Sequence, residues 1–327
     1  MTVLYLTEPG ATLGASSRTL VVRRAGQERA QVPALGLERV VVLAPSHVTS
    51  GAVALCAREQ VDLVVVAHGA RVMARLGASP AGLATLAAQH RRSTEVGFCL
   101  EVARAVVGGK VRNQRRLLRR SAQAAEPAVA AARAELEALL GRAARAETVA
   151  ALRGVEGRAS AVYFRALRVL VNPEFDFRGR NRRPPRDPAN AMLSFAYTLL
   201  TAEAVAGVCA AGLEPALGFY HGPRGGRPAL ALDLVEEFRA PVADALLLQL
   251  TGWRAVRPSQ FRRTDRGVRM NAAARRRFLE GYEAKLSQPF AGRTGAETTL
   301  RGEIRGQAAR MARTIRGEEP YVSFELP

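Results

Sequence analysis

The sequence predicts an α+β protein, in which a small β-rich N-terminal domain precedes a larger all-α domain. Short Val-rich runs, punctuated by Gly and Pro, fill roughly the first ninety residues. From about Pro80 onward, apolar residues recur at helical spacing among abundant Ala, Leu, Arg and Glu. A chain of 327 residues also exceeds the usual size of a single core. The pattern changes between residues 78 and 90, so we expect domains at 1–85 and 86–327.

Four runs in the N-terminal part read as β-strands, at residues 2–6, 19–23, 39–44 and 61–67. An amphipathic stretch between the last two runs predicts one helix. Residues 39–68 therefore predict a β-α-β unit. Because the Gly-x-Gly phosphate fingerprint is absent, this unit is not expected to bind a nucleotide.

The C-terminal part reads as helices joined by loops. The segment "GRNRRPPRDP" at 179–188 predicts a loop. Residues 191–212 predict a buried helix. Residues 229–252 predict another helix that is broken or kinked at Pro241, because proline cannot donate the backbone hydrogen bond.

The charge of the chain is strongly positive. Lys and Arg total 48 against 29 Asp and Glu, a formal net charge of +19. A hydrophobic fraction of 48% excludes a disordered basic tail. Nearly all the basic residues are arginine, which a GC-rich genome would explain, but such a genome does not explain the excess of bases over acids. Nucleic acid is therefore the partner that the charge favours.

Other sequence features restrict the class of protein. Cys56, Cys99 and Cys209 lie far apart without a CxxC pair, so neither a disulfide framework nor a thiolate zinc site is expected. No secretory signal and no uninterrupted run of about 18 apolar residues is found. We expect a soluble cytoplasmic protein with no membrane partner.

Three arginine-rich segments are candidate DNA contacts. Residues 110–120 place four arginines on one face of the expected helix, which fits either a phosphate track or a solvated face. The loop at 178–186 concentrates five arginines beside two stiffening prolines, which favours DNA contact. A third basic segment covers residues 260–278. The arginines of the first two segments are Arg112, Arg115, Arg116 and Arg119, and Arg178, Arg180, Arg182, Arg183 and Arg186.

Two carboxylates, Asp233 and Glu236, lie on an otherwise apolar helical segment. Positions i and i+3 share a face, and unpaired carboxylates there would repel each other and lose hydration. A cation must offset them, either Arg239 one turn later or a divalent metal that also binds His221. On this view, removing one carboxylate charge should not destabilise the metal-free protein.

A third acid, Glu156, lies between Gly154 and Gly157 in a stretch that otherwise reads as helix. Glycines cost a helix about 1 kcal/mol each, but they let a metal or a DNA backbone approach. Glu, His and a second acid form an oxygen–nitrogen set that suits Mn²⁺ or Mg²⁺. An exposed helix with ordinary charges remains the alternative, because spacing alone does not bring Glu156 to His221.

Several stretches together resemble a known family. They are "GVEGRASAVYF", "RRPPRDPANAMLSFAYTLL", "GLEPALGFYHGPRGGRPALALDLVEEFR" and "GYEAKL" followed by "IRGQAARMARTIRGEEPYVSF". In this order they resemble the CRISPR-associated adaptation integrase, the metal-dependent DNA endonuclease/integrase of spacer acquisition. The resemblance covers most of the chain and is looser in its N-terminal part.

The resemblance implies a helical catalytic domain that binds Mg²⁺ or Mn²⁺. Glu156, His221 and an acid of "DLVEE" would hold the metal. Glu236 is the favoured direct ligand and Asp233 the neighbouring carboxylate, and both stay candidates. The segment that supports the site is matched by Asn190, Ser194 and Tyr197.

The resemblance also implies partners and a reaction. The protein would work as a homodimer, and two dimers would bridge through a small ferredoxin-like partner around a fragment of double-stranded DNA. We expect the N-terminal domain to form the dimer, because it has no catalytic set of its own. The fragment's 3′-hydroxyl would attack the leader–repeat junction, so that the protospacer fragment joins the CRISPR repeat. The arginines expected to contact DNA are Arg178, Arg182, Arg183, Arg186 and Arg239.

Two other functions remain open. A non-catalytic basic helical DNA-binding or architectural protein would need the arginines, but not Glu156, His221, Asp233 and Glu236 together. A general metal-dependent nuclease would need the acids, but would cleave DNA without joining it.

Overall fold

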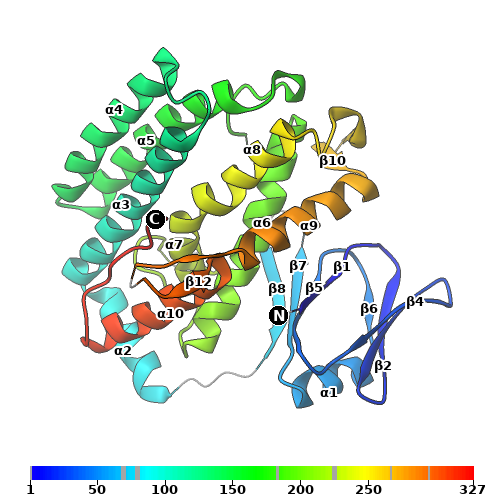
Figure 1. Cartoon of the computed structure of the whole chain (residues 1–327). Coiled ribbons are helices and arrows are strands. Elements are labelled where there is room, and N and C mark those ends of the chain that lie inside the picture. Colours follow the sequence, from blue (N-terminus) through cyan, green and yellow to red (C-terminus); the bar gives the residue numbers. More distant parts are fainter. Residues whose placement is uncertain are drawn as a thin grey trace. The chain divides into compact units, whose positions relative to one another are not determined.

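Contacts within the computed structural model divide the chain into two units, Met1–Pro80 and Ala81–Pro327. This division falls slightly before the predicted boundary at residue 85. The described residues are 2–67, 71–77, 82–181, 184–222, 227–265, 267–293 and 295–327. Strands fill the first unit and helices most of the second (Figure 1). The predicted α+β class is therefore confirmed.

The N-terminal unit is built from two four-stranded sheets and a helix within its described residues. Its elements are β1 (Thr2–Leu6), β2 (Ala11–Ser16), β3 (Thr19–Arg24), β4 (Gln27–Pro33), β5 (Leu37–Val42), β6 (His47–Val48), α1 (Ser50–Arg58), β7 (Asp62–Ala67) and β8 (Arg71–Leu76). One sheet has the order β1-β5-β7-β8, and the other has the order β4-β3-β2-β6. The pairs β1–β5 and β5–β7 are parallel, whereas β8 joins β7 in the antiparallel direction.

The predicted β-α-β unit is present as β5, α1 and β7. The Thr49 hydroxyl accepts a hydrogen bond from the Ala52 N–H at 3.2 Å and so caps the start of α1. Leu55 and Cys56 of α1 are buried in the same core as Leu13 and Val40 of the two sheets. Removing these apolar side chains from water stabilises the unit.

The C-terminal unit is mainly helical, as predicted. Its helices are α2 (Leu83–Thr94), α3 (Val96–Arg120), α4 (Pro127–Ala144), α5 (Val149–Leu170), α6 (Pro188–Ala210), α7 (Ala229–Phe238), α8 (Ala245–Gly252), α9 (Ala272–Ser287) and α10 (Leu300–Arg316). Short 3₁₀ turns cover Pro173–Phe175 and Pro258–Gln260. Two hairpins that the sequence did not predict are formed by β9 (Phe261–Thr264) with β10 (Gly267–Met270), and by β11 (Pro289–Ala291) with β12 (Glu297–Thr299).

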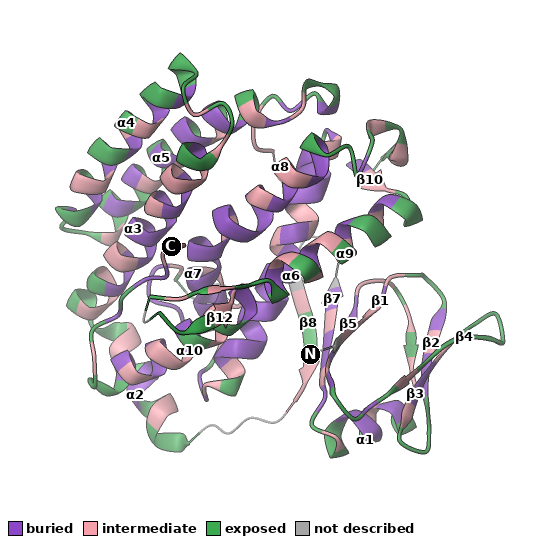
Figure 2. Ribbon diagram, in the orientation of Figure 1, coloured by how far each residue is buried: buried purple, intermediate pink, exposed green. Residues whose placement is uncertain are grey.

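Helix α6 forms the centre of the helical unit and packs against α7 and α10. It begins earlier than the sequence predicted, because the Asp187 side chain caps it and Pro188 fits its first turn. Among the described helices, α6 is the one long and apolar enough to cross a membrane, but 78% of its most apolar window is buried within the protein. Figure 2 shows this burial along α6 and α7. These properties are those of a core helix.

The predicted kink at Pro241 is a π-helical segment, Arg239–Asp244, which connects α7 to α8. Proline lacks the N–H that would bond to the carbonyl four residues earlier, so the turn widens. Most of α7 and of the π segment is buried. The chain therefore places charged residues of α7 inside a packed helical layer.

The C-terminal segment 321–326 packs against α3 and α7. The Tyr321 hydroxyl and the Phe324 N–H donate to the buried Glu237 carboxylate at 2.6 and 2.7 Å. Asn113 of α3 accepts from the Leu326 N–H at 2.9 Å. The segment is thus fixed by hydrogen bonds along its length.

Candidate metal centre

Three helices and one loop bring the predicted residues Glu156, His221, Asp233 and Glu236 together. Glu156 lies on α5, and Asp233 and Glu236 lie on α7. The loop that precedes α7 supplies His221, whose Nε2 is 3.8 Å from Glu236 Oε1. Glu156 is joined to Glu236 through the ammonium of Lys110 on α3, which pairs with both carboxylates. Glu156 and Glu236 are thus linked through Lys110, and His221 lies beside Glu236.

Asp233 is fully buried, and hydrogen bonds surround its carboxylate. Oδ2 accepts from the backbone N–H groups of Phe219 and Tyr220 at 2.7 and 3.0 Å. Oδ1 accepts from the backbone N–H of His221 at 2.8 Å. A Cβ on Gly218 would lie 2.7 Å from the backbone of Ala229, so this turn requires glycine. Asp233 therefore fixes the loop at residues 219–221, and both of its oxygens already accept hydrogen bonds.

The imidazole of His221 is oriented by the same carboxylate. Its Nδ1 lies 2.7 Å from Asp233 Oδ1. A carboxylate oxygen only accepts, so Nδ1 carries the proton in this hydrogen bond, and Nε2 is the ring nitrogen that faces Glu236. The Tyr220 ring meets the imidazole edge to face with centroids 4.9 Å apart. Such a carboxylate–histidine pair is the usual support of a metal-binding nitrogen.

Glu236 is buried between two cations. Its Oε1 is 2.9 Å from Arg239 Nη1, and its Oε2 is 2.8 Å from Lys110 Nζ. Burial by itself would raise the pKa of Glu236, but Arg239 and Lys110 outweigh it and lower the pKa to about 2. Glu236 is therefore an anion at every physiological pH.

Lys110 is the functional residue that sequence reasoning missed. It is buried, and its ammonium lies between the carboxylates of Glu156 and Glu236. The signal was a lysine inside "AVVGGKV", a small and apolar stretch of an arginine-dominated chain. Among the described residues, no three His, Cys, Asp or Glu side chains are grouped closely enough to form a metal site. The position between the two carboxylates is held by an ammonium instead.

The donor set nevertheless fits a divalent cation. Glu156 and Glu236 offer hard oxygen ligands and His221 offers a nitrogen, a combination that suits Mg²⁺ or Mn²⁺. The Lys110 ammonium shows that the space between the two carboxylates accepts a positive charge. His221 Nε2 lies 3.8 Å from Glu236 Oε1, a separation too long for a hydrogen bond.

The site is open on the side of α5. Glu156 is only partly buried, and the Ser160 hydroxyl donates to its Oε1 at 2.9 Å. A Cβ on Gly154 or Gly157 would meet nothing within 4 Å. Packing within the chain therefore does not require these glycines, and they leave space beside Glu156 for another molecule.

Comparison with known proteins identifies the family. The family model for CRISPR associated protein Cas1 matches residues 4–284. The chain belongs to the Cas1 family. A CRISPR-associated endonuclease Cas1 of Thermus thermophilus is 38% identical, over 99% of this chain and 97% of its own length. A CRISPR-associated exonuclease Cas4/endonuclease Cas1 fusion of Rhodospirillum rubrum is 36% identical over 99% of this chain, which spans 57% of the fusion's length.

Solved structures confirm the Cas1 fold. A Cas1 protein from Thermotoga maritima has a TM-score of 0.84 at 20% identity, covering 99% of this chain and all of that one (100%). A casposase bound to its integration product has a TM-score of 0.86 at 20% identity, covering 100% of this chain and 94% of that one. A Cas6-RT-Cas1–Cas2 complex has a TM-score of 0.85 at 21% identity, where the match covers 100% of this chain and 36% of that one. The predicted resemblance is confirmed, and so is the predicted class of DNA endonuclease/integrase at the level of the family.

In this Cas1 family member, Asn190, Ser194 and Tyr197 hold the loop and the π segment beside the site. The Asn190 side chain accepts from Arg180 at 2.8 Å and donates to the Gly179 carbonyl at 2.8 Å. Ser194 accepts from Arg180 at 3.2 Å. The Tyr197 hydroxyl donates to the buried Asp244 at 2.7 Å.

The arginines predicted to contact DNA occupy different surroundings. Arg178 and Arg186 are exposed, and Arg178 pairs with Asp176 at 2.9 Å. Arg182 and Arg183 lie outside the described residues. Arg239 pairs with Glu236 and stacks on the Tyr197 ring, 4.9 Å from its centroid. Arg239 is thus the counter-ion that the sequence offered as an alternative to metal, and DNA contact by these residues stays a prediction.

Proposed function

We propose that this chain is a metal-dependent DNA integrase that inserts short DNA fragments as new spacers into a CRISPR array. The observation that carries the proposal is that Lys110 bridges the carboxylates of Glu156 and Glu236, while His221 Nε2 lies 3.8 Å from the other oxygen of Glu236. Membership of the Cas1 family supports it. The attacking group would be the fragment's 3′-hydroxyl, and its target the phosphodiester at the leader–repeat junction.

The proposed ligands are the carboxylates of Glu156 and Glu236 and the Nε2 of His221. The geometry favours Glu236 over Asp233, because three backbone N–H groups and His221 Nδ1 already occupy the Asp233 oxygens. Asp233 would instead fix the tautomer and direction of His221. Carboxylates that orient a metal-binding histidine in this way commonly raise metal affinity by about 10- to 100-fold.

Each residue then has a defined task in the reaction. When bound, a divalent ion polarises the phosphoryl oxygen and stabilises the charge that develops at the attacked phosphate. Arg239 keeps Glu236 ionised and directed, and Ser160 directs Glu156. Because Asp233 occupies Nδ1 of His221, Nε2 is the ring nitrogen left for a metal, so the proposed task of His221 is ligation. The open side beside Gly154 and Gly157 is where a DNA strand would approach.

The partners are part of the proposal. A homodimer built through the N-terminal unit, and a small ferredoxin-like protein that bridges two dimers, follow from the family resemblance. A chain of the same fold occurs in a solved Cas6-RT-Cas1–Cas2 complex, which supports a Cas2 protein as the partner. The exposed Arg178 and Arg186 would contact the DNA backbone and would carry little sequence information.

The test replaces each proposed ligand, and the changes at the two carboxylates keep the size of the side chain. Glu156→Gln and Glu236→Gln should abolish strand transfer of a labelled fragment into a repeat-containing target, with Mg²⁺ or Mn²⁺ present. His221→Ala should also abolish strand transfer. It should lower the affinity for Mn²⁺ more than the affinity for Mg²⁺, because the harder Mg²⁺ ion gains less from a nitrogen ligand. The control variant Glu318→Gln removes the same charge from an exposed side chain, and it should integrate DNA at the parent rate.

The products decide between this proposal and its alternatives. A parent protein that binds DNA without any metal-dependent reaction would be an architectural protein. Metal-dependent cleavage without joined product would indicate a general nuclease. Strand transfer by Glu236→Gln at the parent rate would show that the proposed ligand set is wrong.

A further inference from the structure

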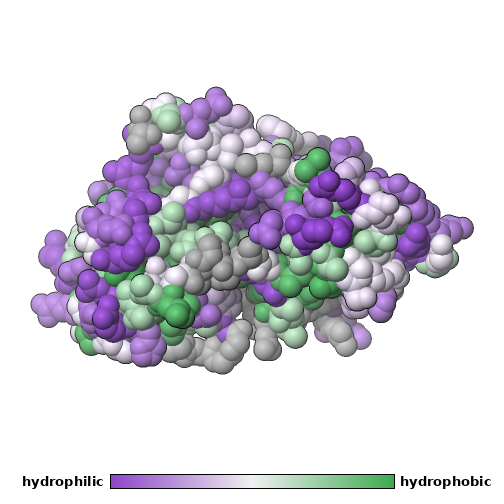
Figure 3. Space-filling view, turned by 90° about the horizontal axis from the view of Figure 1, so that it is seen from below, coloured by the Kyte–Doolittle hydropathy of each residue, from purple (hydrophilic) through white to green (hydrophobic). Residues whose placement is uncertain are grey.

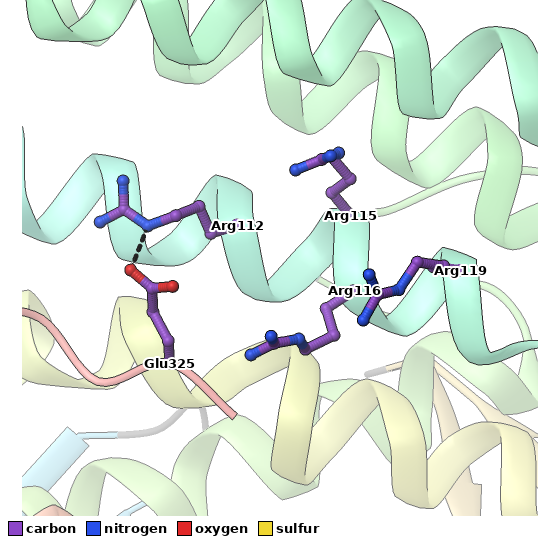
Figure 4. A pocket seen from close by; sticks show the side chains of 5 residues that line it. All are labelled: Arg112, Arg115, Arg116, Arg119 and Glu325. Carbon is purple, nitrogen blue, oxygen red and sulfur yellow. Dashed lines mark ion pairs between the residues drawn. The ribbon is translucent and has the colours of Figure 1, made fainter. Parts of the chain in front are cut away.

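Four arginines of α3 surround one cavity of about 80 Å³. Arg112, Arg115, Arg116 and Arg119 project from successive turns, and Glu325 reaches the cavity from the C-terminal segment (Figure 4). The stripe rises about 10 Å along the helix axis. Arg112 lies about 200° around the helix from Lys110. This cavity, the arginine pocket, is therefore separate from the candidate metal centre.

The arginine pocket has more positive charge than its carboxylates neutralise. Arg112 pairs with Glu325, and Arg115 pairs with Glu137 of α4 at 2.6 Å. Arg116 and Arg119 form no ion pair with a carboxylate in the part of the chain that the structure describes. Burial, together with the neighbouring Arg119 and Arg120, lowers the pKa of Arg116. Guanidiniums gathered in this way are stabilised by an added anion.

Glu325 stands where such an anion would bind. The backbone on either side of it is fixed, by the bond from Phe324 N–H to Glu237 and the bond from Leu326 N–H to Asn113. Ser323 is buried against Gly109 of α3, where a Cβ would lie 2.5 Å from the Ser323 Cβ. The Glu325 side chain itself is 37% exposed. It can therefore leave Arg112 by rotating into solvent, without movement of the backbone.

We propose that the arginine pocket binds phosphates of the DNA backbone, and that Glu325 competes with them for Arg112. The inference rests on the proposed function, because it assigns to this chain a DNA contact away from its reacting centre. A cavity of about 80 Å³ is several times the 10–15 Å³ or so that one water needs, which leaves room for a phosphate group. Guanidinium forks bind phosphate oxygens in pairs.

The spacing favours nucleic acid over an acidic protein segment. A rise of about 10 Å matches roughly three phosphates of one strand, at about 3.4 Å of helix axis each. A repeating charge on the ligand would meet a repeating charge on α3. Strongly hydrophilic side chains also form extended patches on the face drawn in Figure 3, and the net charge of the chain is +19.

Binding of a labelled DNA duplex, measured by fluorescence anisotropy in chelator over a range of salt, tests the proposal. Arg116→Ala and Arg119→Ala should each reduce the slope of log K against log salt by about 0.9. Arg116→Lys should keep the slope. Glu325→Gln should bind DNA more tightly than the parent, by roughly two- to fivefold, because exposed ion pairs are weak.

The exposed pair Arg316–Glu318, joined at 3.0 Å, supplies matched controls. Arg316→Ala and Glu318→Gln repeat the same charge changes away from the pocket, and should leave the slope and affinity closer to those of the parent. Thermal unfolding confirms that each variant is folded.

Three results would overturn the inference. The first is an unchanged slope for both arginine-to-alanine variants, and the second is a Glu325→Gln affinity for DNA no higher than that of Glu318→Gln. For the third, polyglutamate serves as a second probe: arginine variants that lose binding to polyglutamate but keep their binding to DNA would indicate an acidic protein partner. Because chelator prevents the reaction, strand transfer does not affect the outcome. A parent that fails to bind DNA would refute the proposed function, whereas a parent that binds as tightly as its arginine variants would refute only this inference.

Discussion

At the scale of single residues, Lys110 determines how the metal-free site is held. Its ammonium is a compact charge with three donors, which fits between two carboxylates better than a planar guanidinium would. The sequence required a cation beside Asp233 and Glu236, and offered Arg239 or a divalent metal. Glu236 pairs with Lys110 and Arg239, and Asp233 is surrounded by N–H donors. We therefore now expect neutral substitutions at Glu236 to destabilise the metal-free protein.

Replacing Lys110 with Met should lower the free energy of unfolding in chelator by about 3–5 kcal/mol, because the variant leaves buried carboxylates without a partner. Added Mn²⁺ should then raise the melting temperature more than in the parent, since no ammonium competes for the carboxylates. Lys285→Met removes the same charge from a lysine that forms no ion pair with a described residue, and should change stability much less. Equal stability of Lys110→Met and the parent would contradict this role.

The same variant should change the acid limb of the stability curve. Glu236 has a pKa of about 2 in the folded protein, below its ordinary 4.5. A depressed carboxyl pKa contributes stability that is complete above about pH 4.5 and is lost as the pH falls toward 2, on the order of 3 kcal/mol in all. Without Lys110 the pKa should rise, so this loss should become smaller. Denaturant unfolding in chelator between pH 6 and 3 measures the difference.

At the scale of elements, the sequence predicted those helices and strands whose apolar pattern is strong. The parallel unit of β5, α1 and β7, and the break at Pro241, are both present. Strand β4 was not predicted, because "QERAQVP" is mostly exposed and shows no apolar alternation. The π-helical form of the break could not be predicted either. A proline in the sequence predicts that one backbone hydrogen bond is lost, but it does not predict which helical geometry the chain then adopts.

The candidate site shows the same limit. Motifs located Glu156, His221 and Glu236, because these residues lie in distinctive local sequences. The i+3 spacing already offered Arg239 as the partner of Glu236. The contacts of Lys110 depend on how α3, α5 and α7 pack, and spacing along one helix carries no such information. The role of the buried Glu237 likewise depends on the C-terminal segment, whose Tyr321 and Phe324 donate hydrogen bonds to its carboxylate.

Helix α6 and the π segment are joined through Asp244. The hydroxyls of Tyr197 and Tyr163 each donate to this buried carboxylate at 2.7 Å. Tyr197→Phe should lower the free energy of unfolding by about 1–3 kcal/mol, because one acceptor oxygen loses its donor while the ring remains under Arg239. Urea unfolding measures the loss. Tyr163→Phe should have a similar cost, and the double variant should depart from additivity, since the two hydroxyls donate to the two oxygens of one carboxylate. A neutral Tyr197→Phe would show that the bond does not hold the two elements.

At the scale of the whole molecule, the N-terminal unit contributes no residue to the candidate metal centre. It has an apolar core of its own. It also exposes large apolar side chains at Leu35 and Met73, which are 75% and 56% accessible. A unit without catalytic residues that presents apolar side chains to solvent is suited to association with another copy. The homodimer expected from the family resemblance would use this unit.

We therefore expect that removing residues 1–80 will leave a protein that no longer sediments as a dimer. A second variant keeps the full chain and replaces Leu35 and Met73 with Asp, so that like charges would face each other across a two-fold axis. It should be monomeric at concentrations where the parent is dimeric, with unfolding in urea showing that the N-terminal core persists. The matched control, Val96→Asp, alters an exposed apolar residue of α3 in the helical unit (79% accessible) and should leave the dimer intact. Sedimentation of the truncated chain as a clean dimer would place the interface in the helical unit. The full-chain variant would then also remain dimeric, because its charges would lie away from the contact.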